Sequence, residues 1–178
     1  MQVSVDQIRT TSAAALIAHG AGDWQAAEVA RAVARAEETG NVICGLYYLE
    51  SYCLQLASGR VNGTVEPQVH APRPGAVTAD ARLGFAQPAF ARALPLALDA
   101  ARANGIAALA VAHSHTCTSL GYFTEQIAAA GLIGIGVTNA SAIVAGPGGR
   151  HPILGTNPIA ITIPGDGDGP PVMHADFS

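Results

Sequence analysis

The sequence contains no lysine, and its basic residues are not clustered. All nine are arginine, spread singly from Arg9 to Arg150, and the formal net charge is −4. Proteins that bind nucleic acids neutralise phosphates with grouped Lys and Arg side chains. We therefore expect no nucleic-acid partner.

Long apolar runs are also absent. The most apolar stretch, residues 106–111, is far too short to cross a bilayer, and the first residues lack the basic-then-apolar pattern of a signal peptide. Yet 49% of the residues are hydrophobic and only 12% are charged, which excludes a disordered chain. These features predict a cytoplasmic protein with a hydrophobic core and no membrane partner.

Cysteines are too few and too scattered for a disulfide or zinc framework. Cys44, Cys53 and Cys117 show no Cys-x-x-Cys spacing, and their odd number favours free thiols. Cys53 shares a helix face with Leu49 and Leu56, which predicts a place in the core. We expect no structural metal.

Apolar periodicity predicts helices first and then an alternation of helices and strands. The first three helices are expected at residues 5–19, 23–38 and 46–57, with Asp23 as an N-cap. A turn-rich stretch (59–74) precedes helices at 86–103 and 119–130 and strands at 106–112, 132–138, 159–163 and 172–177. We expect residues 106–138 to form one strand–helix–strand unit of a buried sheet.

The fold class predicted is α/β, with N-terminal helices and part of a mixed, non-Rossmann sheet covered by helices. We expect a helical segment at residues 1–60 and a sheet domain at 61–178, incomplete without a C-terminal half that a second chain or a missing segment supplies. No Gly-x-Gly-x-x-Gly follows the first strand. Residues 146–149 are glycine-rich but lack the Lys-Ser/Thr of a phosphate loop, so a plain turn is favoured over a phosphate cradle.

Four segments carry a more specific pattern. LESYCLQLASGRVN (49–62), GLIGIGVTN (131–139), Gly148-Gly149 and LGTNPI (154–159) resemble the type 2 malate/L-lactate dehydrogenase family, which includes ureidoglycolate dehydrogenase, diketogulonate reductase and piperideine-2-carboxylate reductase. The resemblance implies reduction of 2-oxo or cyclic imino acids with NAD(P)H, usually by a homodimer. It also implies that, if NAD(P) is bound, its binding residues are Thr138, Asn139, Gly155, Thr156 and Asn157.

The sequence departs from this family at both active-site histidines. The family's Ser-His-Gly is replaced by Ile43-Cys44-Gly45, so Cys44 stands where the proton donor is expected. The family's Ser-Asn-His-Phe-Gly is replaced by a segment with Thr116 at the histidine position. A thiol, with an ordinary pKa of about 8.5, is a poor substitute for an imidazole acid. Cys44 is thus either a catalytic residue or a small buried side chain.

The densest polar cluster follows the strand expected at 106–112. Because ligands bind beyond the carboxyl ends of strands in α/β sheets, we expect part of it to line an active site. The catalytic candidates there are His113, His115, Thr116, Cys117 and Thr118. Two alternatives are a helix N-cap at Thr118 or Ser119 and a His-x-His-x-Cys metal site. His174 and Asp176 share one strand face, and Asp176 and Ser178 complete the catalytic candidates.

The function favoured by these departures is a self-cleaved amide (C–N) hydrolase. Family chains continue past Asp-Met-Ala with Thr-Ser, whereas this sequence stops at Asp176-Phe177-Ser178. In this hypothesis the present sequence is the alpha chain, and its partner is a second chain from the C-terminal half of the same precursor. That chain's N-terminal hydroxyl residue is the nucleophile, and its free amine is the base.

We expect such a hydrolase to need no cofactor, to act on a small polar substrate, and to form a heterodimer that assembles further by dimerisation. Two alternatives stay open. One is an NAD(P)H-dependent oxidoreductase of 2-oxo or cyclic imino acids. The other is a non-catalytic subunit.

Overall fold

The computed structural model describes residues 3–167 and 169–177 of the 178-residue chain. These residues form two compact units, one up to Cys117 and one from Thr118 onwards. Each unit has its own sheet, with strand order β1-β2-β3 in the first and β4-β7-β8 in the second.

Helices open the first unit. Helix α1 (Val5–Ala18) begins with a capping box in which Ser4 and Gln7 each accept the other's backbone N–H. It is followed by α2 (Asp23–Glu38), the short 3-10 helix η1 (Val42–Cys44) and α3 (Leu46–Ala57). Gly22 is the N-cap of α2 and Asp23 its first residue, so the expected cap was one residue late. The helices enclose a core that includes Leu16, Val29, Val33, Tyr52 and Phe85.

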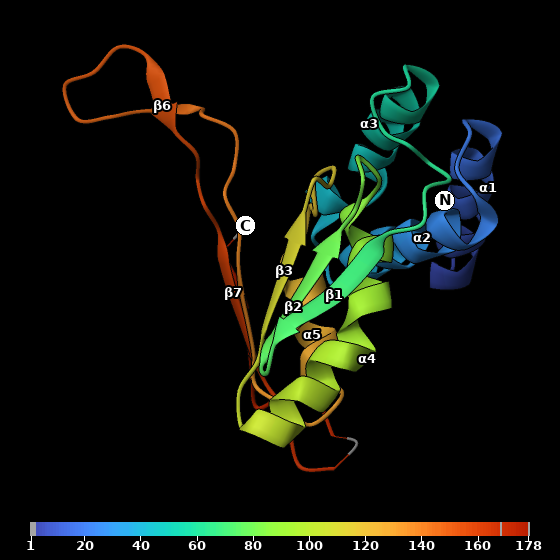
Figure 1. The fold of residues 1–178 in the computed structure, drawn as a ribbon. Coiled ribbons are helices and arrows are strands. Elements are labelled where there is room, and N and C mark those ends of the chain that lie inside the picture. Colours follow the sequence, from blue (N-terminus) through green and yellow to red (C-terminus); the bar gives the residue numbers. More distant parts are fainter. Residues whose placement is uncertain (1–2, 168, 178) are drawn as a thin grey trace. The chain divides into compact units, whose positions relative to one another are not determined.

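The first sheet is built around a parallel pair. Strand β1 (Gln68–Arg73) runs antiparallel to β2 (Ala76–Asp80), and β2 runs parallel to β3 (Ala108–Ala112). The connection from β2 to β3 is α4 (Ala86–Asn104), which lies along the sheet in Figure 1. Its alanines pack against the buried residues Val77 and Ala79 of β2. This is the strand–helix–strand arrangement that parallel pairing requires.

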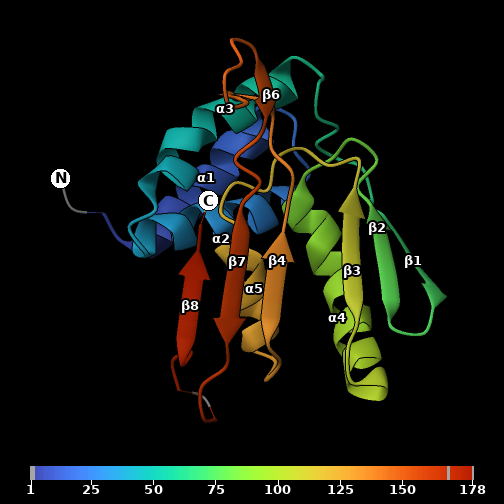
Figure 2. The same ribbon diagram turned by 90° about the vertical axis from the view of Figure 1, so that its left-hand side faces the viewer.

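The second unit is an antiparallel sheet with one helix. Strands β4 (Gly134–Val137), β7 (Ile159–Ile163) and β8 (Met173–Asp176) pair in that order, and β5 (Val144–Ala145) and β6 (Pro152–Leu154) form a separate hairpin. Helix α5 (Gly121–Ala128) lies against one sheet face, as Figure 2 shows. The approach is close, because a Cβ at Gly134 would lie 2.7 Å from the Thr124 carbonyl oxygen.

The structure confirms the α/β class and corrects the expected sheet. Strands β3 and β4 belong to different sheets, so residues 106–138 do not form the expected strand–helix–strand unit. The parallel partner of β3 is β2. Strand β2 was not predicted because a turn-rich segment directly precedes it. The division expected at residue 60 stays a prediction, as does completion of the sheet by further sequence. Among the described residues, no helix combines the length and apolar character needed to cross a membrane.

The first core gives a stability test with two leucines. Leu16 is fully buried whereas Leu54 is 60% exposed. Leu16→Ala should lower the free energy of unfolding by about 2–5 kcal/mol, because it leaves a cavity. Leu54→Ala should change it by no more than about 0.5 kcal/mol. Urea unfolding of the full-length protein measures the free energy of unfolding of both variants. Equal losses in the two would contradict this description of the core.

Candidate functional site

The carboxyl ends of β2 and β3 lie side by side and lead into two joined loops. The last pair of the parallel ladder is Asp80 with Ala112. Beyond this pair, the backbone N–H of Leu83 donates to the carbonyl oxygen of His113 (2.8 Å). The backbone N–H of His115 donates to the carbonyl oxygen of Gly84 (2.8 Å). We call residues 80–84 and 113–117 the strand-end site. It occupies the place where open α/β sheets bind ligands.

The backbone of this site is strained. Arg82, Leu83 and His113 have positive φ angles of 51°, 64° and 50° although none is glycine. Such conformations cost on the order of 1–3 kcal/mol each and gather at functional sites. Three of them in two adjoining loops distinguish the strand-end site from an ordinary pair of turns.

His113 is paired with a carboxylate. Its Nδ1 lies 3.1 Å from Oδ1 of Asp80, and the same Oδ1 accepts the backbone N–H of Arg82 at 2.7 Å. The hydrogen bond from Arg82, followed by that from His113, lowers the pKa of Asp80. Asp80 therefore stays ionised at neutral pH. The sequence pattern had not singled out Asp80.

His115 has a different environment. Its ring packs edge-on against Tyr52 and Phe85, with centroid distances of 5.7 and 5.9 Å. Burial lowers the pKa of His115, and the positive charge of Arg60 lowers it further, so the imidazole is neutral at neutral pH. The side-chain amide of Gln87 donates both to the Tyr52 hydroxyl (3.1 Å) and to the Cys117 carbonyl oxygen (3.3 Å), which ties this aromatic cluster to the loop.

The other candidates of the first unit are spread over two segments. Thr116 is exposed and Cys117 half-buried in the strand-end site, and Cys44 is half-buried at the end of η1, before α3 begins. Their catalytic roles stay predictions. The described residues contain no group of three His, Cys, Asp or Glu side chains that could hold a metal ion. A His-x-His-x-Cys metal site therefore gains no support.

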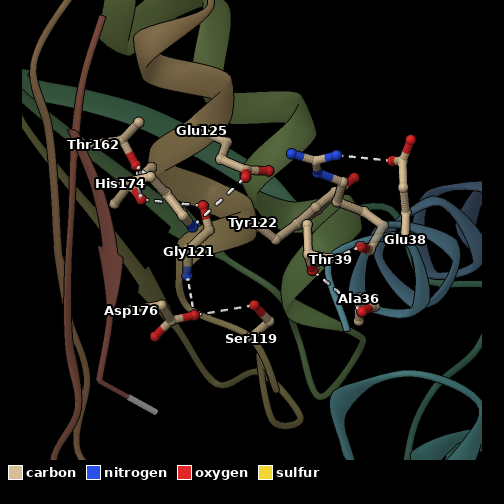
Figure 3. A network of polar contacts seen from close by, with 12 residues as sticks. Ala36, Glu38, Thr39, Ser119, Gly121, Tyr122, Glu125, Thr162, His174 and Asp176 are labelled. Atoms are coloured by element: carbon tan, nitrogen blue, oxygen red, sulfur yellow. Dashed lines mark hydrogen bonds and ion pairs between the residues drawn. The ribbon is translucent and has the colours of Figure 1, made fainter. Parts of the chain in front are cut away.

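Asp176 caps a helix in the second unit. One of its oxygens accepts the Ser119 hydroxyl (3.1 Å) and the backbone N–H of Gly121 (2.7 Å) at the start of α5, as Figure 3 shows. The expected cap at Thr118 or Ser119 is wrong, because Leu120 is the N-cap residue and its side chain makes no cap bond. Thr118, which opens this unit with φ 57°, and Asp176 remain predictions as catalytic residues; Ser178 lies outside the described residues.

His174 lies on the same face as Asp176, as expected. A Cβ at Gly121 would lie 2.8 Å from Cε1 of His174 and 2.9 Å from Oδ2 of Asp176. The His174 ring is held between Thr162, whose hydroxyl is 2.9 Å from Nδ1, and Glu125, 3.6 Å from Nε2 (Figure 3). These contacts join β8 to α5 and β7, so they organise the second unit.

The five candidate cofactor residues lie in two adjoining loops of the second unit. Oδ1 of Asn157 accepts the backbone N–H of Ala140 (3.0 Å), and the Thr138 N–H donates to Pro158 (3.3 Å). A Cβ at Gly155 would overlap the Ala140 carbonyl oxygen, so this close contact requires glycine. The remaining two candidates, Asn139 and Thr156, are exposed. We call residues 138–140 and 155–157 the paired loops.

The glycine-rich segment near these loops is a turn. The backbone N–H of Gly149 donates to the Gly146 carbonyl oxygen at 2.8 Å, and Gly148 has a φ of 72°. This geometry connects β5 to β6 and matches the plain turn favoured from the sequence.

Comparison with known proteins gives concordant results. The sequence model of the malate/L-lactate dehydrogenase family matches residues 3–178. The chain is 36% identical to a (2R)-3-sulfolactate dehydrogenase (NADP(+)) of Chromohalobacter salexigens, over 99% of this chain and 53% of that protein. It is 35% identical to a Delta(1)-pyrroline-2-carboxylate/Delta(1)-piperideine-2-carboxylate reductase of Pseudomonas aeruginosa, over 100% and 53%.

A solved structure agrees with these matches. The delta1-piperideine-2-carboxylate reductase of Pseudomonas syringae superposes with a TM-score of 0.92 at 35% identity, covering 99% of this chain and 52% of that one. The chain thus spans about half the length of the curated relatives it matches.

These findings overturn the hydrolase hypothesis. The relatives are named as dehydrogenases and reductases, so a self-cleaved amide hydrolase is the wrong expectation. A second chain from the same precursor is wrong too, because the match lies within single continuous chains. Absence of a cofactor also lacks support, since one relative is named for NADP(+). The chain belongs to the malate/L-lactate dehydrogenase family.

Proposed function

We propose that this chain forms part of an NAD(P)-dependent oxidoreductase that reduces small 2-oxo acids or cyclic imino acids. The observation that carries the proposal is similarity along the whole chain to reductases and dehydrogenases of such acids, at 35–36% identity over at least 99% of its residues. Since the match covers about half of each relative, the activity is proposed for the full-length protein and not for these residues alone.

The charges around the strand-end site support an acidic substrate. Arg82 belongs to the site and is exposed, and Arg60 is near enough for its charge to lower the pKa of His115. Guanidinium groups bind carboxylates with paired hydrogen bonds. The substrates in the names of the relatives are carboxylic acids. The positive charges of Arg60 and Arg82 near the two histidines suit the binding of such acids.

The paired loops suit a dinucleotide. They present the hydroxyl of Thr156 and the amide of Asn139 in exposed positions, next to a backbone kept free of side chains at Gly155. Hydroxyl and amide groups pair with the ribose and phosphate oxygens of a nucleotide. We assign NAD(P) binding to Thr138, Asn139, Gly155, Thr156 and Asn157. When bound, the cofactor supplies the hydride, and the residues of the chain bind and orient the acid and deliver the proton.

The function is tested by following NADPH and NADH oxidation at 340 nm with a panel of 2-oxo and cyclic imino acids. We expect turnover with at least one acid in the ordinary enzyme range of about 1–1000 per second. A matched panel of the corresponding amides should give none. Absence of turnover with every acid and both cofactors, in protein that unfolds cooperatively, would refute the proposal.

The paired loops are tested separately through cofactor affinity. Asn139→Ala should weaken NADPH binding several-fold to about tenfold, the effect of losing a hydrogen bond of ~0.5–1.5 kcal/mol. Asn104→Ala, at the end of α4, serves as the matched control and should leave affinity unchanged. Quenching or enhancement of NADPH fluorescence measures both. Equal affinity in all three proteins would exclude Asn139 from the binding site.

A further inference from the structure

The proposed reduction needs a proton, and neither position that the family resemblance assigns to a histidine supplies an imidazole here. Cys44 and Thr116 occupy those positions. A carbonyl or imine that accepts a hydride must also gain a proton at its oxygen or nitrogen, and a positioned imidazole is the commonest donor. A histidine donor supplied by this chain would therefore stand at a different position.

We propose that His113, positioned by Asp80, is the proton donor of the reaction; this inference rests on the proposed oxidoreductase function. Both residues stand at the carboxyl ends of the parallel strands, and the Nδ1 of His113 lies 3.1 Å from Oδ1 of Asp80. A carboxylate that accepts from Nδ1 fixes the tautomer and the orientation of the ring. The Nε2 atom, on the other side of the ring, is then the group that meets the substrate.

The position of His113 is set by its backbone. Its φ of 50° turns the chain sharply after β3, and its carbonyl oxygen accepts the Leu83 N–H at 2.8 Å. The side chain remains 68% exposed, so a ligand above the strand ends can reach Nε2. Asp80 keeps its negative charge because Arg82 and His113 both donate to it and lower its pKa.

His115 is less suited to the role. Its ring is enclosed by Tyr52 and Phe85, and burial together with Arg60 favours its neutral form. A neutral ring without a carboxylate partner does not hold a proton ready for transfer. The two histidines of the strand-end site thus differ in function. His113 donates the proton, and His115 packs against Tyr52 and Phe85 beside it.

The reduction adds one hydride and one proton to the double bond of the substrate. The substrate carbon gains the hydride that the reduced cofactor supplies, and the π electrons of the C=O or C=N bond move to the oxygen or nitrogen. That atom takes the proton from Nε2 of His113, which forms the O–H or N–H bond of the product. His113 is left neutral and regains a proton from water, while Asp80 remains ionised throughout.

The test combines kinetics with the protonation state of the ring. His113→Asn is the first variant, because asparagine tolerates positive φ; Asp80→Asn is the second, and His19→Gln, at the end of α1, is the control. His113→Asn should lower kcat about 100- to 10,000-fold, while NADPH affinity and the unfolding midpoint stay unchanged. Asp80→Asn should lower kcat about 10- to 100-fold, by analogy with the loss of the partner that orients a metal-bound histidine.

The second readout is ¹⁵N NMR of histidine-labelled protein, which needs no turnover. Neutral His113 should carry its proton on Nδ1, and in Asp80→Asn the tautomer protonated on Nε2 should become populated. An active protein in which His113→Asn keeps kcat within about threefold overturns this proposal alone, since a proton donor is worth at least about 100-fold. A neutral His113 that carries its proton on Nε2 in the unaltered protein also overturns it. If the unaltered protein fails to oxidise NADPH and NADH with every acid of the panel, the proposed function is wrong, and this inference is wrong with it.

Discussion

The parallel pairing of β2 with β3 is the constraint on which the strand-end site depends. Five consecutive residue pairs, from Ala76 with Ala108 to Asp80 with Ala112, fix where both strands end. Because side chains alternate along a strand, Asp80 lies on the face opposite to Val77 and Ala79, which pack against α4. A shift of one residue would direct the carboxylate into that core and remove it from His113.

The core of the first unit supports this arrangement from the side of the helices. Phe85 belongs to the core cluster of α1, α2 and α3 and also contacts the ring of His115. Tyr52 of α3 does the same. A change in the packing of the N-terminal helices would therefore reach the loop after β3 directly, through two aromatic side chains. Activity and stability are consequently coupled more closely at Tyr52 and Phe85 than at exposed His113.

Helices and core residues could be predicted from the sequence, whereas the first two strands could not. Helical spacing gave the bounds of α3, and those of α1 and α4 to within one residue. Strand β1 contains Pro72 and lies next to Pro74 and Gly75, residues that favour turns; an edge strand with an irregular register tolerates them. Strand β2 (Ala76–Asp80) follows this stretch directly and was not predicted either, so neither Asp80 nor its pairing with His113 could be foreseen.

Short sequence motifs identified the family correctly. The departures from its pattern, in contrast, led to the wrong expectation of a hydrolase. LGTNPI and GLIGIGVTN form the paired loops and the strand before them, where the close contact of Gly155 with the Ala140 carbonyl oxygen restricts which residues fit. A missing histidine says only that one side chain has changed. It does not show which reaction replaced the old one, because another residue brought close by the fold can take over the task.

The cap of α5 by Asp176 has a consequence for how the chain folds. The bond between the Asp176 carboxylate and the Gly121 N–H closes a loop of 55 residues, and an isolated helix of eight residues is marginal in water. On the ribosome, α5 therefore emerges long before its stabilising partner and stays frayed until β8 has been made. Pulse-labelled hydrogen exchange during refolding should then protect the α5 amides no earlier than those of β8, because contacts between residues far apart in sequence form slowly.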